Sequence, residues 1–401
     1  MSAADTLEER RELLDSRRLD RPVDTNESMH LAKERAGVPF AQQSRDMLSL
    51  RRGSGGIEPN EYYYFGLYDR TLFDDAARAA FLGRWRVHRM ASAFNEEVFG
   101  KTGDKVAIQR MLAAVGIAVP RTLALYNRDG TVDEGIRHVG DIDDLRRLFL
   151  EIPSAGLFGK PVSSVGSLGV ISIDGFDVES DRLQISDGGS VSLREFVVEL
   201  KRYEEDGYQF QERLHCHFDI KPILGNRIGT LRVLVANDGE PQIVRTSWKI
   251  PTGTNMADNF WRKGNLLAAV EPETGRVYRV VDDVYPRLKE ITEHPDSHVR
   301  LIDFMLPDWR EMREMVIEAS RTLTGLPLLG WDVALTDRGP VIVEVEGNGG
   351  HPMMTQLAQG RGLLEEPAIR SVMEKMRKMQ PSMPVLLFRY IRRKVLGKAA
   401  P

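Results

Sequence analysis

The segment from Val341 to Gly350 reads VIVEVEGNGG, and it decides how the rest of the chain is interpreted. Side chains alternate between the two faces of a β-strand, so we expect Glu344, Glu346 and Asn348 on one face and the alternating valines on the other. Three oxygen-bearing side chains on one face are costly to bury unless a cation compensates for them. The segment therefore predicts a strand that ends at a metal site.

A hairpin is expected to bring another acid to this row. Asp332 lies in the run GWDVAL, and a turn at Asp337-Arg338-Gly339 leads into VIVEVEGNGG. Folding at that turn places Asp332 across from Glu344. Mg²⁺ is commonly held by a few carboxylates together with substrate phosphates, so the hairpin predicts a Mg²⁺ site; the alternative is a solvent-facing strand with charged side chains. Three nearby glycines favour the metal site, because a ligand can approach their backbone closely.

The composition restricts the class of protein. A chain of 401 residues is too long for one small core, so two or three lobes are expected. Its 42% hydrophobic and 28% charged residues are typical of a soluble globular protein, and its net charge of -4 argues against a general nucleic-acid-binding protein. The single cysteine, Cys216, excludes an intramolecular disulfide. The charged N-terminal segment and the lack of a run of about 20 apolar residues predict a cytoplasmic protein.

Periodicity and turn residues predict an α+β chain with mostly antiparallel sheets. A hairpin is expected around Asn237-Asp238-Gly239 and a helix over Trp309 to Leu323. Four segments are predicted: a helical region over 1–100, a first lobe with a phosphate loop over 101–208, a second lobe over 209–365, and a C-terminal helix with a basic tail over 366–401.

Two further segments have two interpretations each. The aromatic run EYYYFGLYDR (61–70) can serve as a binding platform, but aromatic clusters near a lobe boundary are more often packing, and we predict packing. The basic segment PVLLFRYIRRKVLGKAA (384–400) can make weak contact with an anionic membrane surface, but we favour an ordinary surface helix that caps a lobe.

A second candidate site is the segment FGKPVSSVGSLGV (158–170). Lys160 ends an apolar strand there, and a Ser/Gly loop follows. Small residues with available backbone N–H groups can wrap a polyphosphate, and the lysine adds a positive charge. The segment lacks the Gly-Lys-Ser/Thr pattern of a Walker loop, and Ser/Gly loops are common between strands. The acidic hairpin downstream is what favours a nucleotide site.

The order of these motifs resembles the ATP-grasp superfamily. Asp104-Lys105 on a helix is followed by GKP with the Ser/Gly loop, then QER (211–213), TLRV (230–233) and GWDVAL…GPVIVEVEGN (330–348). The spacing is similar to that of D-alanine–D-alanine ligases, whereas TLRVLV, DNF…GN and GWDVAL look closer to the sugar-transfer-associated ATP-grasp branch. The resemblance covers residues 101–364 and implies two α+β lobes that grip ATP.

The resemblance also implies a role for each matching residue, with ATP and Mg²⁺ as cofactors. The residues implied to bind ATP are Lys105 and Lys160 at the phosphates, Ser163, Ser164, Gly166 and Ser167 in the closing loop, Gln211, Glu212 and Leu214 at the adenine, and Asp219, or alternatively His217, at the ribose. Arg232 is implied to steady the transferred phosphate, and Lys249 is a candidate to face an acyl phosphate. Asp332, Glu346 and Asn348 are implied to hold one or two Mg²⁺ ions.

One departure from the family pattern concerns the acids of the last strand. The usual pattern is Glu-x-Asn, and the strand offers both Glu344-x-Glu346 and Glu346-x-Asn348. We take the second pairing because it restores the expected residue types. Glu344 is then an additional ligand or an acid in the outer shell of the metal.

The remaining signals concern the substrates. The loop ADNFWRKGN (257–265) offers Asn259, Arg262 and Asn265 to a carbohydrate or a carboxylate, and it can equally be an ordinary connection. His215 and His217 flank Cys216 but lack the second ligand pair of a zinc site.

The resemblance implies a ligase that joins a small-molecule carboxylate to an amine or sugar acceptor through an acyl phosphate, with a link to surface-polysaccharide synthesis. The alternatives are a kinase acting on a small-molecule or sugar acceptor and a non-catalytic nucleotide-binding scaffold of a glycosyltransferase complex.

Overall fold

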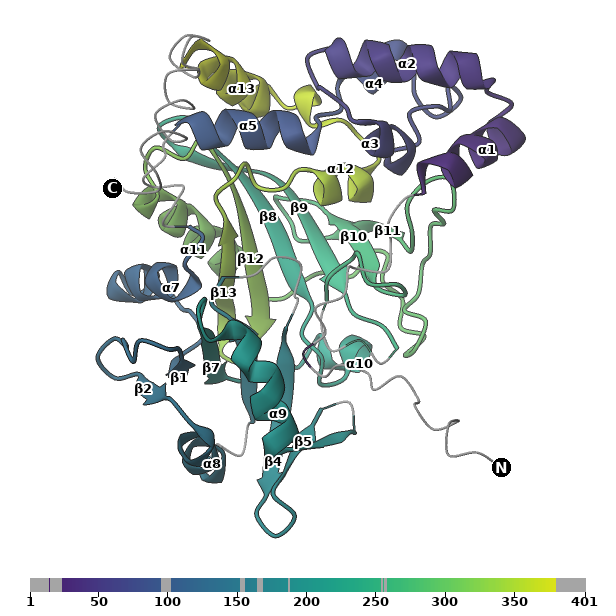
Figure 1. The fold of residues 1–401 in the computed structure, drawn as a ribbon. Coiled ribbons are helices and arrows are strands. Elements are labelled where there is room, and N and C mark those ends of the chain that lie inside the picture. The colour runs from purple at the N-terminus through teal and green to yellow at the C-terminus, as the bar shows by residue number, and fades with distance from the viewer. Residues whose placement is uncertain are drawn as a thin grey trace, which may run out of the picture.

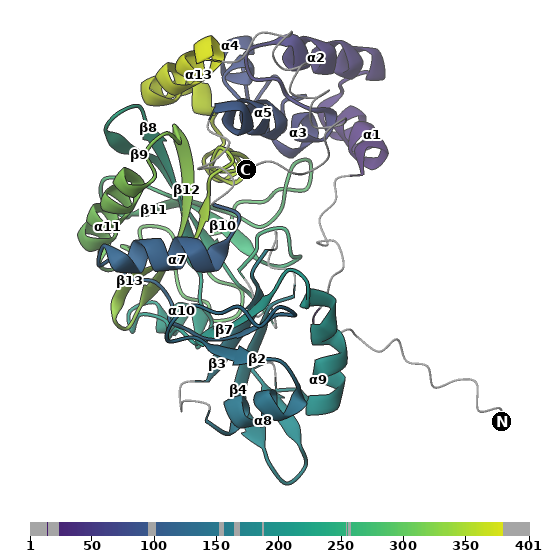
Figure 2. The same cartoon turned by 60° about the vertical axis from the view of Figure 1, so that its left-hand side comes forward.

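Two β-sheets build the frame of the molecule in the computed structural model (Figure 1). The structure describes residues 14, 24–94, 102–151, 156–163, 169–186, 188–253, 255 and 258–379. The N-terminal helices lie at one end and a seven-stranded sheet lies at the other, with a six-stranded sheet between them (Figure 2). The predicted α+β fold with mostly antiparallel sheets and a helical N-terminal region is confirmed.

The seven-stranded sheet has the strand order β2-β1-β7-β3-β4-β5-β6. Only β1 and β2 pair in parallel, and the other neighbours are antiparallel. The strands are β1 (Thr122–Tyr126), β2 (Arg137–Val139), β3 (Leu157–Pro161), β4 (Ile171–Asp177), β5 (Arg182–Ile185), β6 (Ser190–Ser192) and β7 (Tyr208–Glu212).

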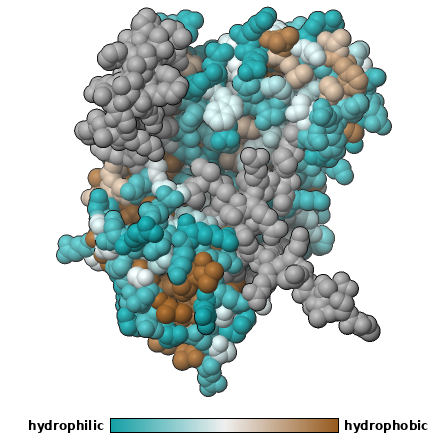
Figure 3. All heavy atoms as spheres, viewed as in Figure 1, coloured by the Kyte–Doolittle hydropathy of each residue, from teal (hydrophilic) through white to brown (hydrophobic). Residues whose placement is uncertain are grey.

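Two amphipathic helices, α8 (Ile142–Leu150) and α9 (Leu193–Leu200), cover one face of this sheet. Their buried rings Phe149 and Phe196 pack on Phe210 of β7, with ring centroids 5.7 and 6.3 Å apart. The space-filling view shows hydrophobic side chains on the outer surface of this half of the molecule (Figure 3). The rings of Phe149, Phe196 and Phe210 belong to a core of the seven-stranded sheet that is separate from the core of the six-stranded sheet.

The six-stranded sheet is fully antiparallel, in the order β11-β10-β9-β8-β12-β13. Both predicted hairpins are present: β8 ends at Asn237, the first residue of its predicted turn, and β12 ends at Thr336, just before its turn. The strands are β8 (Thr230–Asn237), β9 (Pro241–Ile250), β10 (Leu266–Val270), β11 (Val277–Val281), β12 (Leu328–Thr336) and β13 (Gly339–Glu346).

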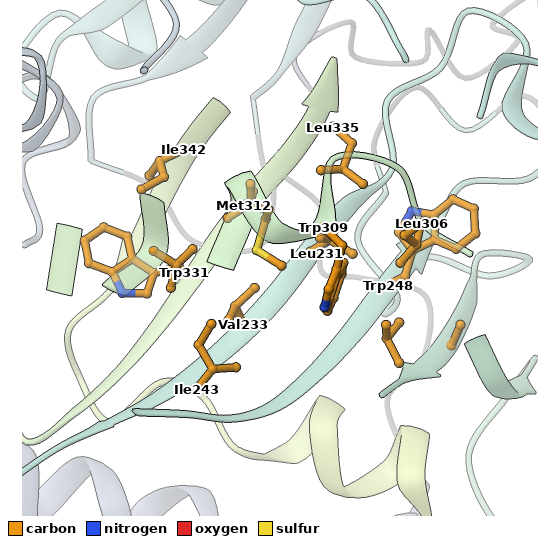
Figure 4. Packing of buried hydrophobic residues seen from close by; sticks show 14 of the residues in the cluster. Leu231, Val233, Ile243, Trp248, Leu306, Trp309, Met312, Trp331, Leu335 and Ile342 are labelled. Atoms are coloured by element: carbon orange, nitrogen blue, oxygen red, sulfur yellow. The ribbon is translucent and has the colours of Figure 1, made fainter. Parts of the chain in front are cut away.

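One face of the six-stranded sheet carries the largest core (Figure 4). Helix α11 (Trp309–Thr322), which confirms the helix expected from Trp309 to Leu323, packs on this face and buries Met312 and Val316. Inside the core, Trp331 donates a hydrogen bond from Nε1 to the Ser320 hydroxyl at 2.8 Å. Helix α7 (Lys105–Ala114) joins the same core through Ile108 and Leu112.

The opposite face of the sheet is covered partly by helices that come from both ends of the chain. The predicted packing role of the aromatic run is confirmed, because Tyr62, Tyr63 and Phe65 are buried against β10 and β11. The helices that contribute here are α1 (Thr25–Ala36), α2 (Phe40–Arg52), α3 (Pro59–Tyr64), α4 (Asp75–Ala79), α5 (Arg84–Phe94), α12 (Met353–Gln359) and α13 (Pro367–Met379).

The predicted segment boundaries can be placed on these elements. The expected division at 208 and 209 falls at the start of β7, which pairs with β1 and β3 of the seven-stranded sheet. Helix α7, expected in the first lobe, packs on the six-stranded sheet instead. The basic tail at 384–400 lies outside the described residues. Within the described ranges, no helix combines the length and the apolar character needed to cross a membrane.

A bulge in β13 corrects the expected alternation of its side chains. Asp332 pairs with Glu344 as predicted, but the next pair is Val333 with Ile342, so Val343 has no partner across the ladder. Ile342, and not Val343, therefore joins Val345 in the large core. Such an insertion changes which residues share a face, and strict alternation in the sequence cannot reveal it.

The turn after β13 is held by helix α5. Gly349 has φ +93°, and a Cβ atom there would overlap the side chain of Val87. Gly349→Ala is expected to lower the free energy of unfolding by about 2–4 kcal/mol, because the backbone strain and the overlap add together. Chemical denaturation measures this change.

A matched control is Gly135→Ala, where φ is +83° but no atom lies within 4 Å of the added Cβ. This control is expected to cost only about 1–2 kcal/mol, from the backbone alone. Adding Val87→Ala to Gly349→Ala is expected to remove the overlap contribution. Equal losses for Gly135→Ala and Gly349→Ala would show that Val87 does not constrain the turn.

Candidate active site

A cleft with a volume of about 470 Å³ lies between the two sheets. One wall comes from β3, β4 and the segment after β7; the other comes from the six-stranded sheet and from the loops around residues 226–230 and 253–258. Charged side chains are frequent in its lining: Lys105, Lys160, Asp174, Glu212, Arg213, Arg227, Lys249, Asp258, Asp332 and Glu344.

Three buried charged residues lie together at the cleft: Asp332 and Lys249 line it, and Arg232 bonds Asp332 without lining it. Asp332 on β12 lies directly opposite Arg232 on β8, and its carboxylate accepts hydrogen bonds from Nε of that arginine at 2.6 Å and Nη2 at 3.1 Å. Lys249 on β9 projects from the same face, because it lies two residues beyond Ser247, the partner of Arg232. Its Nζ donates to Asp332 Oδ2 at 2.9 Å.

These contacts keep the three residues charged. Burial favours the neutral form of Asp332, but Arg232 and Lys249 hold its pKa well below the usual range. Burial also lowers the pKa of Lys249, but the carboxylates of Asp258 and Asp332 outweigh this effect and raise it. Both oxygens of Asp332 accept hydrogen bonds from cationic side chains, and Oδ1 keeps a lone pair, so its role as a Mg²⁺ ligand stays a prediction.

The other predicted metal ligands follow along β13. Glu344 Oε1 lies 3.4 Å from Lys105 Nζ, and Glu346 Oε1 lies 3.9 Å from Arg232 Nη2. Burial raises the pKa of Glu346, partly offset by Arg232. Asn348 Oδ1 is buried and accepts no hydrogen bond from the residues that the structure describes.

This donor set suits a Mg²⁺ ion that is bound partly by phosphate. The unsatisfied Asn348 oxygen and the Glu346 carboxylate match the Glu-x-Asn pattern, and a cation would satisfy both. In the part of the chain that the structure describes, no three His, Cys, Asp or Glu side chains are grouped closely enough to hold a metal alone. Phosphate oxygens and water would have to complete the coordination.

Two lysines from different elements lie beside strand β13: Lys160 contacts Val343, and Lys105 contacts Glu344. Lys160 on β3 points its Nζ toward the carbonyl oxygen of Val343, 3.4 Å away, at the bulge of β13. Burial lowers the pKa of Lys160 to about 8. Lys105 is the first residue of α7, directly after the N-cap residue Asp104. Both lysines line the cleft, as the predicted phosphate-binding roles require.

Some other residues expected at the nucleotide are also in the lining, and some are not. Gln211, Glu212 and Leu214 line the cleft after β7. The Asp219 side chain is 59% exposed and does not line the cleft, and His217 faces Asp308 at 3.6 Å. Ser163 is exposed, whereas Ser164, Gly166 and Ser167 lie outside the described residues.

The loop expected to bind a substrate places its asparagines inward. Asn265 is fully buried; its Oδ1 accepts from the Thr252 backbone N–H at 3.1 Å, and its Nδ2 donates to the Asn259 carbonyl at 2.9 Å. Asn259 Oδ1 accepts the Trp261 backbone N–H. Arg262 has a buried Nε without a hydrogen-bond partner among the described residues, and it does not line the cleft.

Other residues of this region line the cleft, although no sequence pattern marked them as such. They are Asn226, Arg227, Gly253, Asn255 and Asp258. Asp258 belongs to the DNF motif, which was noted for its resemblance to the family but was given no role. Only the packing of the loop around Asn265 shows which of its polar residues face the cleft.

Comparison with known proteins agrees with this geometry. The family model described as sugar-transfer associated ATP-grasp matches residues 87–372. No curated protein matches the chain.

Solved structures with a similar fold include ligases of several kinds. The D-alanine–D-alanine ligase from Coxiella burnetii is 14% identical, with a TM-score of 0.37, over 74% of this chain and 62% of that one. The VanG D-Ala:D-Ser ligase from Enterococcus faecalis is 13% identical, with a TM-score of 0.39, over 70% of this chain and 62% of that one. This chain therefore spans about three fifths of the length of these solved proteins. Because the family match covers both sheets and every residue that lines the cleft, the chain belongs to the sugar-transfer-associated ATP-grasp family.

Proposed function

We propose that the protein is an ATP- and Mg²⁺-dependent ligase that joins a carboxylate to an amine through an acyl phosphate. The observation that carries this proposal is the convergence of Lys105 and Lys160 with Asp332 and Glu344 in the lining of one cleft between the sheets. Arg232 and Glu346 do not line the cleft, but Arg232 bonds Asp332 at 2.6 Å and lies 3.9 Å from Glu346. Ligation at neutral pH needs an activated acyl group, and phosphoryl transfer from ATP supplies one with little covalent work by the protein.

Each half of the reaction has a place in this geometry. A carboxylate oxygen of the substrate would attack the γ-phosphorus, and the bond to the bridging oxygen of ADP would break. Arg232 suits the transferred phosphate because its buried Nη1 has no hydrogen-bond partner within the described ranges, while Asp332 holds the rest of the guanidinium in place. The amine would then attack the acyl carbon and expel phosphate.

Bound Mg²⁺ would supply charge neutralisation between the ATP phosphates, and Glu346 and Asn348 are the residues proposed to hold it. The two lysines would bind phosphate oxygens, and the segment from Glu212 to Leu214 would receive the adenine. The family description supports a role in cell-surface polysaccharide or sugar-conjugate synthesis, where the acceptor would be an amine or a sugar.

The direct test is incubation with MgATP, hydroxylamine and a panel of carboxylic acids that includes amino acids and uronic acids. Hydroxamate, ADP and phosphate are expected together with the correct acid, because hydroxylamine traps an acyl phosphate. AMP as the product would exclude the proposed route. Phosphate retained on an acceptor would identify a kinase, and nucleotide binding without turnover on any substrate would favour the scaffold.

The Glu346→Gln variant tests the proposed metal ligand. Removing the charge while keeping the shape is expected to raise the Mg²⁺ concentration needed for half-maximal turnover by at least about 10-fold, with unchanged folding by circular dichroism. Glu318→Gln is a control, since Glu318 is an exposed residue of α11 that pairs with Arg321. An unchanged Mg²⁺ requirement in Glu346→Gln would remove Glu346 from the site.

A further inference from the structure

The acids that line the cleft are not equally neutralised. Five carboxylates face it, and four of them have a cationic partner at hydrogen-bonding distance. These four pairs are Asp174 with Arg213, Glu212 with Arg338 at 2.9 Å, Asp332 with Arg232 at 2.6 Å, and Glu344 with Lys105 at 3.4 Å. The fifth acid is Asp258.

Among the described residues, no cation lies within hydrogen-bonding distance of Asp258, which forms only a longer ion pair with Lys249. The Nζ of Lys249 lies 3.8 Å from Oδ2 of Asp258 and donates to Asp332 at 2.9 Å instead. The same Oδ2 accepts the backbone N–H of Thr230 at 2.6 Å and also the Thr230 hydroxyl. Oδ1 receives no hydrogen bond from the described residues. Both hydrogen bonds from Thr230 go to the same oxygen and leave Oδ1 for a ligand.

The rest of the surrounding wall does not offer Asp258 a cation closer than Lys249. Arg227 also lines the cleft, but its guanidinium donates to Asp296 at 2.9 Å and to the carbonyls of Leu224 and Gly253. Asn255 is polar but uncharged, and its Nδ2 is bonded within the loop. Asp258 and Asp332 share Lys249, and the lysine bonds Asp332, so Oδ1 of Asp258 remains open to a cationic group of a bound molecule.

We propose that Asp258 binds the ammonium group of the acceptor, which makes the acceptor an organic amine and the new bond a C–N bond. This inference rests on the proposed ligase function. Asp258 suits this place because its carboxylate is linked through Lys249 to Asp332 and Arg232, the residues proposed to lie at the transferred phosphate.

The proposed step balances. The ammonium group gives one proton to Asp258 Oδ1, and the resulting amine attacks the acyl carbon. The C–N bond forms as the C–O bond to phosphate breaks, and the oxygen keeps the electron pair. The second nitrogen proton ends on the leaving phosphate, and the proton on Asp258 passes to water. Asp258 thus returns to its charged form.

Rubidium tests the cation site without any knowledge of the substrates. Rb⁺ resembles an ammonium ion in size and charge, and its anomalous scattering locates it in crystals grown with Mg²⁺ and a non-hydrolysable ATP analogue. We expect an anomalous peak beside Asp258 Oδ1 in the wild type and none in Asp258→Asn, whose amide keeps the acceptor for Thr230. A wild-type crystal without this peak would overturn the proposal.

Kinetics test the acceptor role with the acid identified by the hydroxamate assay. Hydroxylamine is largely uncharged at neutral pH, so the effect of Asp258→Asn on the KM for hydroxylamine is expected to be several-fold smaller than its effect on the KM for an ammonium-bearing acceptor. The KM for an ammonium-bearing acceptor is expected to rise at least about 10-fold, as loss of a charged hydrogen bond predicts. An unchanged KM would contradict the proposal.

The Asp296→Asn variant is the control for an effect that acts only through the anchoring of the loop. Asp296 fixes the same region, since its Oδ2 accepts the Gly253 backbone N–H at 2.8 Å, but it does not line the cleft. An equal rise in KM in this control would show that Asp258 acts only through the loop, which would also overturn the proposal. If no acid yields hydroxamate, the ligase function fails, and the rubidium result still decides the cation site.

Discussion

Replacing Asp332 with leucine is expected to lower the free energy of unfolding by about 3–5 kcal/mol, which is a large part of the stability of a typical domain. The side chains of Arg232 and Lys249 are 4% and 8% exposed, and Asp332 is their common partner. Removing that carboxylate leaves two buried positive charges without their main compensation. Denaturation with urea, followed by tryptophan fluorescence, measures the loss.

Two controls separate the buried charge from simple loss of contacts. The double variant Asp332→Leu/Arg232→Met lacks one of the two buried positive charges that lose their partner. This double variant is therefore expected to be more stable than Asp332→Leu alone. Glu374→Gln breaks an exposed pair with Lys378 at 2.7 Å and is expected to cost less than about 1 kcal/mol. A loss below about 1 kcal/mol in Asp332→Leu would contradict the role assigned to this cluster.

Replacing Lys160 with methionine is expected to have opposite effects on stability and on nucleotide binding. The fall of the Lys160 pKa from 10.5 to about 8 corresponds to about 3 kcal/mol of destabilisation of the folded state near pH 7. Lys160→Met removes this charge from the buried site, so the nucleotide-free protein is expected to gain about 1–3 kcal/mol in free energy of unfolding. Loss of a phosphate contact is expected to weaken MgATP binding at least about 10-fold, measured by calorimetry.

The pH dependence gives an independent check of the same residue. Between pH 8 and 10.5 the unfolded chain still binds the lysine proton that the folded protein has lost. Wild-type stability is therefore expected to gain a rising contribution with pH in this window, and Lys160→Met is expected to lack it. The stability advantage of the variant should shrink accordingly. Lys289→Met, at an exposed lysine, is the control, and a constant difference from pH 7 to 10 would show that the pKa of Lys160 is not lowered.

MgATP affinity is expected to fall as the pH rises above about 8 in the wild type, because neutral lysine no longer attracts phosphate. This fall should be absent in Lys160→Met. Higher stability combined with weaker MgATP binding in Lys160→Met would show that the buried charge of Lys160 lowers the stability of the fold and strengthens ligand binding.

The sequence alone determined the local structure and much of the charge pattern. Turn residues at Asn237-Asp238-Gly239 and Asp337-Arg338-Gly339 predicted both hairpins, since such turns depend on a few neighbouring residues. The ordered motifs identified the family, and the pairing of Asp332 with Glu344 followed from the hairpin. The hairpins and the pairing within them depend on contacts between residues that are close together in the sequence.

The tertiary structure decided which charge compensates which. The hairpin predicted Asp332 as a Mg²⁺ ligand, but it could not show that Arg232 and Lys249, about 100 and 83 residues away in the sequence, bond its carboxylate. Asn265 faces inward and Asp258 faces the cleft because the loop packs on Thr230 and Thr252. The bulge at Val343 shifts one strand face relative to the sequence pattern. A buried charge is stabilised by whichever partners the fold brings within a few ångströms, and that proximity between distant segments is fixed only when the sheets and loops pack.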